Sequence, residues 1–408
     1  MAPSLSGWRR FLLVAGPGLV VMLADTDAGS VITAAQSGAQ WGYRLLLMQF
    51  LLVPILYIVQ ELTVRLGAVT GKGHAELIAQ HFGRFWAWFS VATLIASCIG
   101  ALLSELSGIS GVGALMGIPT PATLALVVVA LLAMAFTRSY LAVERIALVV
   151  GAFELVFLLV AWMAHPSASE VVAGSLSIPL SDSKYLYLAS ANIGAVIMPW
   201  MVFFQQSSVV EKKLAAADLG VARLDTGLGA LLTQLIMASV LIAVAATLGK
   251  AGGDRQLDTV QQISEAITPF LGRRGGDVLF ALGMSGASLV ATIVVTLTAA
   301  RTLAEVIGVK HSLDHEPAEA PWFYGAYAAA LIIGAVVVGS GVDLVALSVG
   351  VQVMNALLLP IVLTFLFLLA RHLPEPFRLE GAYAWIAGTL IGVTTIFGVY
   401  AGLVGLWS

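Results

Sequence analysis

Long apolar segments separated by short polar ones recur along the whole chain. A helix needs about 20 predominantly apolar residues to cross the hydrocarbon core of a bilayer. The pattern predicts eleven transmembrane helices, at about residues 10–37, 43–67, 84–116, 121–137, 144–164, 184–213, 220–249, 275–306, 321–340, 342–371 and 382–406. We therefore expect an all-α membrane protein in which residues 1–408 form a single transmembrane domain.

The composition excludes the main soluble classes. Hydrophobic residues make up 59% of the chain and charged residues only 11%, which is too little charge to cover a soluble core of this length. We therefore expect no enzyme, no cofactor and no nucleic-acid partner, and we expect a monomer surrounded by the lipid bilayer. Cys98 is the only cysteine, so no intramolecular disulfide can form.

The positions of lysine and arginine predict the orientation in the membrane. With the N-terminus in the cytoplasm, 14 of the 20 lie on the inside, which the positive-inside rule favours. The inner positions are Arg9, Arg10, Arg65, Lys72, Arg84, Arg138, Arg145, Lys212, Lys213, Arg223, Arg301, Lys310, Arg371 and Arg378. The outer positions are Arg44, Lys184, Lys250, Arg255, Arg273 and Arg274. We expect a multi-pass protein of the plasma (inner) membrane with a cytoplasmic N-terminus and an extracellular C-terminus.

The first predicted span carries two acidic residues, Asp25 and Asp27, in the middle of an apolar run. Carboxylates at this depth are stable only when they face a cavity, a partner charge or an ion. Gly29 and the neighbouring polar residues also weaken the helix. We expect an interrupted helix here, and the alternative is that the span ends early and Asp25 caps a short re-entrant piece.

The sixth predicted span is interrupted in a matching place. Pro199 removes a backbone donor and clashes with the preceding turn, and Gly194 lowers the cost of unwinding. An ordinary proline kink would explain this span alone. However, spans 1 and 6 are equivalent members of two five-helix halves, at about 10–164 and 184–371, with an extra helix at about 382–406. Interrupted helices in corresponding positions predict a binding site at the membrane midplane, and the acidic groups favour a cation.

Several motifs occur in order at matching spacings. They are Gly16-Pro17-Gly18, Asp27-Ala28-Gly29-Ser30, Gly38-Ala39-Gln40-Trp41-Gly42-Tyr43, Arg65 to Lys72, Gly194-Ala195-Val196-Ile197-Met198-Pro199-Trp200, and Gln352 followed by Pro360. These motifs resemble the natural resistance-associated macrophage protein (NRAMP) family of divalent-metal transporters. The resemblance implies a LeuT-type fold with two inverted five-helix repeats. It also implies a metal site at Asp27, Met198 and Gln352.

Further candidate ligands lie beside these positions. The break before Pro199 should free the backbone carbonyl of Ala195 for the ion. Ser30 stands where the family has a ligating asparagine, and its shorter hydroxyl would bind through water. Asp25 lies about 200° around an ideal helix from Asp27, so it should share the ion only if the helix unwinds between them.

The sequence departs from the family at the residues that carry protons. The family's two sixth-helix histidines are replaced by Trp200 and Gln205, and the third-helix aspartate is absent. Glu105 keeps the place of the family's third-helix glutamate if the segment aligns without a shift, and a one-residue shift would put Ser104 there. These losses resemble the NRAMP-related magnesium transporters, a branch with a roomier site and no proton coupling.

The chemistry of the ligands leaves the cargo open between two ions. Magnesium dehydrates reluctantly and uses one or two carboxylates, so losing the asparagine favours a partly hydrated ion. The thioether of Met198 favours manganese. We predict uptake of Mg²⁺, with Mn²⁺ also carried, without proton coupling. The alternatives are a proton-coupled Mn²⁺/Fe²⁺ importer, a sodium-coupled organic-solute transporter of the same fold, and a signalling module like the family's ethylene-pathway relative.

Other charged residues lie inside or near the ends of the predicted spans. Glu154 is in the middle of the fifth span, where it marks a pathway, is protonated or pairs with a neighbouring helix. The i,i+4 spacings of Glu61 with Arg65 and of Arg301 with Glu305 predict ion pairs within helices.

Overall fold

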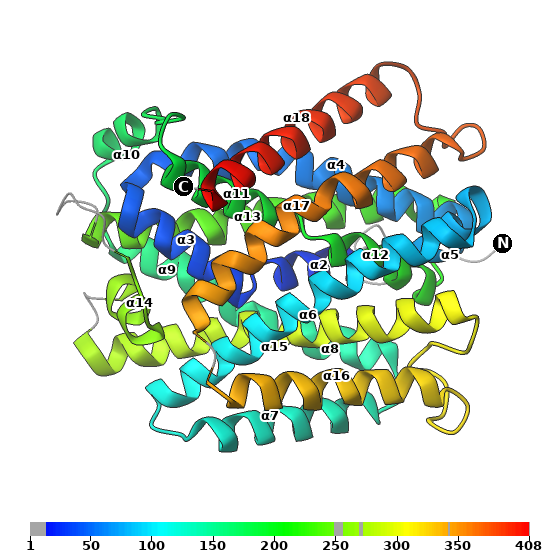
Figure 1. Ribbon diagram of the computed structural model, residues 1–408, viewed down its shortest axis with the longest axis horizontal. Helices are drawn as coiled ribbons and strands as arrows, with labels where there is room; N and C mark the ends of the chain where they lie inside the picture. Colours follow the sequence, from blue (N-terminus) through cyan, green and yellow to red (C-terminus); the bar gives the residue numbers. More distant parts are fainter. Residues whose placement is uncertain (1–13, 249–255, 269–271, 342, 408) are drawn as a thin grey trace, which may run out of the picture.

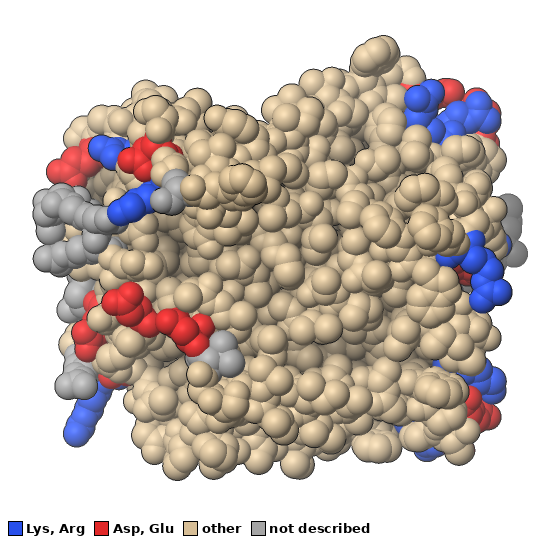
Figure 2. Space-filling model, viewed as in Figure 1, with Lys and Arg blue, Asp and Glu red and all other residues tan. Residues whose placement is uncertain are grey.

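The computed structural model describes residues 14–248, 256–268, 272–341 and 343–407, and these residues are nearly all helical. The long helices lie side by side along the longest axis of the molecule (Figure 1). Charged side chains gather at the two ends of this axis, and a broad band between them shows none (Figure 2). Large apolar side chains such as Leu126, Trp162 and Ile396 are exposed, as expected for contact with lipid tails. The chain is therefore a multi-pass membrane protein.

The long uninterrupted helices fall on the predicted spans. They are α4 (Leu46–Thr70), α6 (Arg84–Leu115), α7 (Thr120–Ala135), α13 (Leu219–Leu248), α15 (Gly272–Ile307), α16 (Pro321–Gly339), α17 (Leu344–Arg371) and α18 (Gly381–Leu406). The predicted start of the first span, the end of the seventh span at residue 249, and Arg9, Arg10, Lys250 and Arg255 lie outside the described residues, as does the side chain of Arg273.

Shorter elements connect the long helices. They are the 3₁₀ turn η1 (Gly42–Leu45), α5 (His74–Phe82), α10 (Ala168–Ser175), η3 (Ala216–Asp218) and α14 (Val260–Ile267). The fifth predicted span is α8 (Tyr140–Gly151), the 3₁₀ turn η2 (Ala152–Leu155) and α9 (Val156–Met163). The hydrophobic pattern did not predict the turn at η2. A 3₁₀ turn inside a helix marks a strained or hinged position, and this one contains Glu154.

The two predicted interruptions are present. The first span consists of α2 (Pro17–Asp25) and α3 (Ala28–Trp41), and the sixth consists of α11 (Ser183–Val196) and α12 (Pro199–Glu211). Asp27 and Met198 have extended backbone conformations at the two breaks. Because α3 continues for 14 residues beyond the first break, the alternative of a span that ends early at Asp25 is wrong.

The two broken helices share helix α17 as a packing partner, because α17 contacts both α3 and α11. Helix α13 packs against α2, α3 and α4, and α11 packs against α17 and α18. Gly194 permits the close approach of α11 to α17, because a Cβ at this position would collide with the carbonyl oxygen of Gln352. The packing therefore brings Gln352, from the second half of the chain, close to the breaks.

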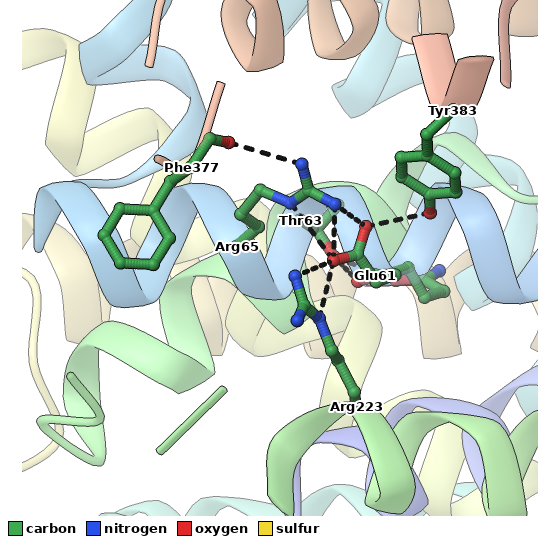
Figure 3. A network of polar contacts seen from close by, with 7 residues as sticks. Glu61, Thr63, Arg65, Arg223, Phe377 and Tyr383 are labelled. Carbon is green, nitrogen blue, oxygen red and sulfur yellow. Dashed lines mark hydrogen bonds and ion pairs between the residues drawn. The ribbon is translucent and has the colours of Figure 1, made fainter. Parts of the chain in front are cut away.

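A network of charges at Glu61 holds three helices together (Figure 3). Arg65 donates to both carboxylate oxygens of Glu61 at 2.9 Å, which confirms the predicted i,i+4 pair. Arg223 of α13 donates to Oε1 at 2.9 Å, and the hydroxyl of Tyr383 of α18 donates to Oε2 at 3.0 Å. Three donors thus satisfy a carboxylate that is only 2% exposed.

The second predicted i,i+4 pair, Arg301 with Glu305, is wrong. The guanidinium of Arg301 lies 3.3 Å from Glu211 of α12 instead. Glu305 accepts a hydrogen bond from the Ser207 hydroxyl at 3.3 Å. The packing of α15 against α12 sets both contacts, rather than the spacing along one helix.

Candidate ion site at the two broken helices

Asp27 is the N-cap residue of α3. Its Oδ1 accepts hydrogen bonds from the Ser30 amide at 2.6 Å and from Gln352 Nε2 at 3.3 Å, while Oδ2 is buried without a partner. An aspartate suits this position because its side chain satisfies an amide that the first helical turn leaves free. One carboxylate oxygen therefore remains available at the first break.

The second break exposes a backbone acceptor. The carbonyl of Ala195 would normally accept from the amide four residues later, but that residue is Pro199, which has no N–H. The carbonyl oxygen instead accepts a hydrogen bond from the Ser30 hydroxyl at 2.9 Å. Ser30 therefore joins the two breaks, since its amide holds Asp27 and its hydroxyl holds Ala195.

Helix α17 adds a chain of amides and hydroxyls to this group. The side chain of Gln352 donates to Asp27, and its Oε1 accepts from Asn355 Nδ2 at 3.0 Å. Asn355 in turn accepts from the Ser97 hydroxyl at 2.7 Å. Gly29 lies against the side chain of Gln352, and a Cβ there would displace the terminal amide of Gln352. The sequence analysis did not name Ser97. A polar residue within the apolar helix α6 was the signal that could have identified it.

The structure brings four of the six candidate residues together, namely Asp27, Ser30, Ala195 and Gln352. Met198 is fully buried at the N-cap of α12, where its amide faces the sulfur of Met201 at 3.5 Å. Asp25 is also buried, but it ends α2 and both its carboxylate oxygens lack hydrogen-bond partners. Asp25 therefore makes no hydrogen bond to the group that contains Asp27.

Glu105 also reaches the first break. Its Oε2 accepts from the amide of Ala28 at 3.0 Å, and its Oε1 has no hydrogen-bond partner. Asp27 and Glu105 thus satisfy two of the free amides at the N-terminus of α3.

Trp200 and Gln205, which stand at the family's two histidine positions, are uncharged. Gln205 donates to the Thr226 hydroxyl at 2.9 Å and accepts from Thr63 at 3.1 Å. Trp200 is fully buried. His74 begins α5 and lies against Gln206 of α12, with Nδ1 at 2.9 Å from Oε1. Burial lowers the pKa of His74 to about 4, so it is neutral near pH 7.

The donor set limits how an ion can be held. In the part of the chain that the structure describes, no three His, Cys, Asp or Glu side chains are grouped to hold a metal ion. An ion bound between the breaks would therefore take carbonyl, amide, hydroxyl or water oxygens in addition to Asp27. Such ligands suit hard divalent cations.

Comparisons with known proteins give one consistent family. The profile described as natural resistance-associated macrophage protein-like matches residues 18–403. The divalent metal cation transporter MntH of Ralstonia nicotianae is 28% identical over 310 residues, which cover 72% of this chain and 69% of that protein. The MntH protein of Levilactobacillus brevis is 28% identical over 327 residues, which cover 75% and 70%.

The solved structures agree in fold. A manganese transporter from Eremococcus coleocola has a TM-score of 0.77 at 19% identity, with 99% of this chain and 88% of that chain covered. MhsT, solved in complex with L-phenylalanine, has a TM-score of 0.63 at 16% identity, with 96% and 98% covered. These neighbours confirm the predicted LeuT-type fold, and the count of eleven spans stays a prediction.

Proposed function

The chain belongs to the natural resistance-associated macrophage protein-like family, and from that premise we propose that it carries divalent metal ions across a membrane. It is a membrane transporter and not an enzyme. The matched relatives are named divalent metal cation transporters, and the similar structure is that of a manganese transporter. The proposed cargo is therefore a divalent metal ion.

The observation that carries this proposal is the pair of acceptors at the two breaks. Asp27 keeps one buried carboxylate oxygen without a partner, and Pro199 leaves the Ala195 carbonyl without an amide in its own helix. An ion that bound Asp27 Oδ2 and the Ala195 carbonyl would displace the Ser30 hydroxyl from that carbonyl. The Ser30 hydroxyl and the Gln352 amide oxygen would then face the ion or its water ligands.

We propose that magnesium is carried partly hydrated and that manganese is carried too. One carboxylate with neutral oxygen ligands suits magnesium, which keeps several waters. The serine at position 30 is shorter than the family's asparagine and leaves room for one of them. Met198 ends the second break, and its thioether would favour manganese if it turned toward the ion.

We propose that transport runs down the gradient of the metal without moving protons. The support is the pair Trp200 and Gln205 at the family's histidine positions, where Gln205 is held by Thr226 and Thr63. The second candidate is a proton-coupled manganese importer. It is favoured by the names of the relatives and by Glu105, whose Oε1 is free beside the break.

The proposed setting follows the charge pattern. The N-terminus lies in the cytoplasm, the C-terminus lies outside, and the protein acts as a monomer in the plasma (inner) membrane. Two halves, at about 10–164 and 184–371, would alternate around the ion as one transport domain. The half-helices α2 and α12 would move during this change, because α2 ends at the first break and α12 begins at the second.

Purified protein in liposomes with an internal pH-sensitive dye tests both candidates. We expect external Mg²⁺ and Mn²⁺ to enter without acidification of the lumen. Acidification that rises with metal dose, and disappears in Glu105→Gln, would establish the proton-coupled candidate instead. Absence of uptake of every divalent ion by folded protein would refute metal transport itself.

A further inference from the structure

A second group of buried acids lies next to the proposed ion site. Asp25 and Glu154 are 1% and 0% exposed, and all four of their carboxylate oxygens lack a hydrogen-bond partner. A buried carboxylate without a partner is costly, and more so at the depth of a bilayer. Such groups in a folded protein require a specific explanation.

The two acids come from different helices that glycines bring together. Asp25 is the last residue of α2, and Glu154 lies in the 3₁₀ turn η2 of the fifth span. Gly151 packs against the side chain of Leu23 of α2, where an added Cβ would lie only 2.8 Å from it. Gly286 of α15 lets that helix approach the carbonyl of Val150 in the same way. The irregular turn at Glu154 is therefore pressed against the first break.

Two hydroxyl groups connect these acids. The hydroxyls of Thr26 and Thr233 lie 2.7 Å apart and join the first break to α13. The Thr26 hydroxyl lies near the carboxylate of Glu154 and the Thr233 hydroxyl lies near that of Asp25, but neither makes a geometric hydrogen bond to it. Asp25 and Asp27 are both within electrostatic range of Glu154. The hydroxyl pair therefore lies among carboxylate oxygens, which are ligands for a cation.

Among the described residues, no basic side chain pairs with the carboxylates around the first break. Asp25, Asp27, Glu105 and Glu154 surround the first break, and each retains at least one oxygen without a hydrogen-bond donor. One divalent ion at Asp27 would offset half of their four charges when all are ionised. A second divalent ion would offset the remainder, whereas a monovalent ion would not.

We propose that Asp25 and Glu154, with the hydroxyls of Thr26 and Thr233, form a second divalent-cation site. The ligands are hard oxygens, as Mg²⁺ and Mn²⁺ require. This proposal rests on the proposed function, because the occupant is the same cargo. Asp25 belongs to α2 and Asp27 caps α3, so a tilt of α2 about Thr26 would separate the two sites. In the proposed orientation α2 is the cytoplasmic half of the first span. The second site would then bind the ion last, before its release to the cytoplasm.

Counting bound manganese tests the second site. The purified full-length protein is dialysed to equilibrium against Mn²⁺ at saturating concentration, and bound metal per protein is measured. We expect two ions in the unchanged protein and one ion in each of Glu154→Gln and Asp25→Asn. Asp27→Asn should also bind one ion, held by the second site. Thr233→Val should keep the site but weaken it by about tenfold, the lower end for loss of a supporting polar group.

The control is Glu144→Gln. Glu144 is a similarly buried carboxylate on the preceding helix α8, but Lys212 already neutralises it at 2.6 Å. This variant should still bind two ions. Gel filtration and thermal unfolding of the metal-free variants check folding, and Glu154→Gln should unfold at the same or a higher temperature because it removes an unpaired charge.

The outcomes separate the second site from transport itself. One ion in the unchanged protein, lost in Asp27→Asn, overturns the second site and leaves the proposed function intact. Two ions in Glu154→Gln overturn the assignment of Glu154. Displacement of one manganese ion by physiological Na⁺ overturns the divalent occupant. No bound manganese in the unchanged protein overturns both proposals.

Discussion

The two broken helices offer different kinds of oxygen ligand for a cation. The first break is surrounded by four buried carboxylates, Asp25, Asp27, Glu105 and Glu154. The second break, at Ile197 and Met198, contains no charged residue, and the acceptor nearest to it is the Ala195 carbonyl. The first break therefore offers charge through side chains, and the second offers a backbone dipole.

The two breaks are also maintained by different forces. The amides at the start of α3 are satisfied by Asp27 and Glu105, one of which comes from another helix. At the second break, Pro199 removes the amide that would have bonded Ala195. The first break thus depends on side chains that tertiary packing holds in place, and the second depends on covalent structure. This contrast predicts which substitutions each break tolerates.

The largest expected effect is at Asp27. Asp27→Asn retains the shape of the N-cap but removes the charge, so the metal affinity of the site between the two breaks should fall by roughly 100-fold or more, about 2.7 kcal/mol or more. Calorimetric titration with Mn²⁺ and uptake by liposomes measure this. Glu76→Gln, an exposed carboxylate on α5, is the control and should behave as the unchanged protein. Near-normal uptake by folded Asp27→Asn would show that the first break does not hold the cargo.

The second break should respond to backbone changes and not to side-chain changes. Pro199→Ala restores an amide that competes for the Ala195 carbonyl, so metal affinity should fall by about tenfold, or 1.4 kcal/mol. Ala195→Gly and Ala195→Ser leave the carbonyl in place and should change affinity by less than about threefold. The same titration compares all three variants. A larger loss in Ala195→Ser than in Pro199→Ala would contradict the role of the backbone.

Ser30 connects the two breaks, and its substitution should shift preference more than strength. Ser30→Asn supplies an amide oxygen that reaches an ion directly, so the ratio of Mn²⁺ to Mg²⁺ affinity should rise by about tenfold. Competition between the two ions in liposome uptake measures the ratio. Ser30→Ala loses the hydrogen bond to Ala195, worth about 1 kcal/mol, and serves as the comparison. An unchanged ratio in Ser30→Asn would remove position 30 from selectivity.

The smallest effect near neutral pH concerns the anchor of the second broken helix. His74 contacts Gln206 and lies against Phe203, both on α12. Its pKa is about 4 when folded, against 6.5 when unfolded, so the unfolded chain binds more protons between these values. The stability that neutral His74 contributes is complete above pH 6.5 and is lost as pH falls toward 4, by at most about 1.4 kcal/mol per pH unit.

Thermal unfolding between pH 7 and pH 4 measures this dependence. His74→Gln keeps a polar group beside Gln206 without a titrating ring, so its unfolding temperature should fall less over the same range. Equal slopes in the two proteins would exclude His74 as the source. The first break, which His74 does not touch among the described contacts, should keep its metal affinity in His74→Gln.

The sequence was sufficient for features that depend on local chemistry. Apolar length predicted the helices, and Pro199 with Gly194 predicted the second break. Two acids in an apolar run predicted the first break, because a carboxylate at membrane depth costs free energy unless it faces a cavity, a partner charge or an ion. Asp27 could be chosen over Asp25 because the motifs on both sides of it resemble those of the family.

Tertiary structure alone decided which groups meet. The bond between Ser30 and Ala195 joins residues 165 positions apart, and the pairing of Arg301 with Glu211 replaced an expected neighbour on the same helix. The sequence left the role of Glu154 open between marking a pathway, being protonated and pairing with a neighbouring helix. Only the packing of helices puts it beside Thr26 and within electrostatic range of Asp25. Hydrophobic periodicity determines that a helix crosses the membrane but not how it is rotated against its neighbours. In an all-apolar helix the rotation is set by close contacts at glycines such as Gly151 and Gly194, which act between helices distant in sequence.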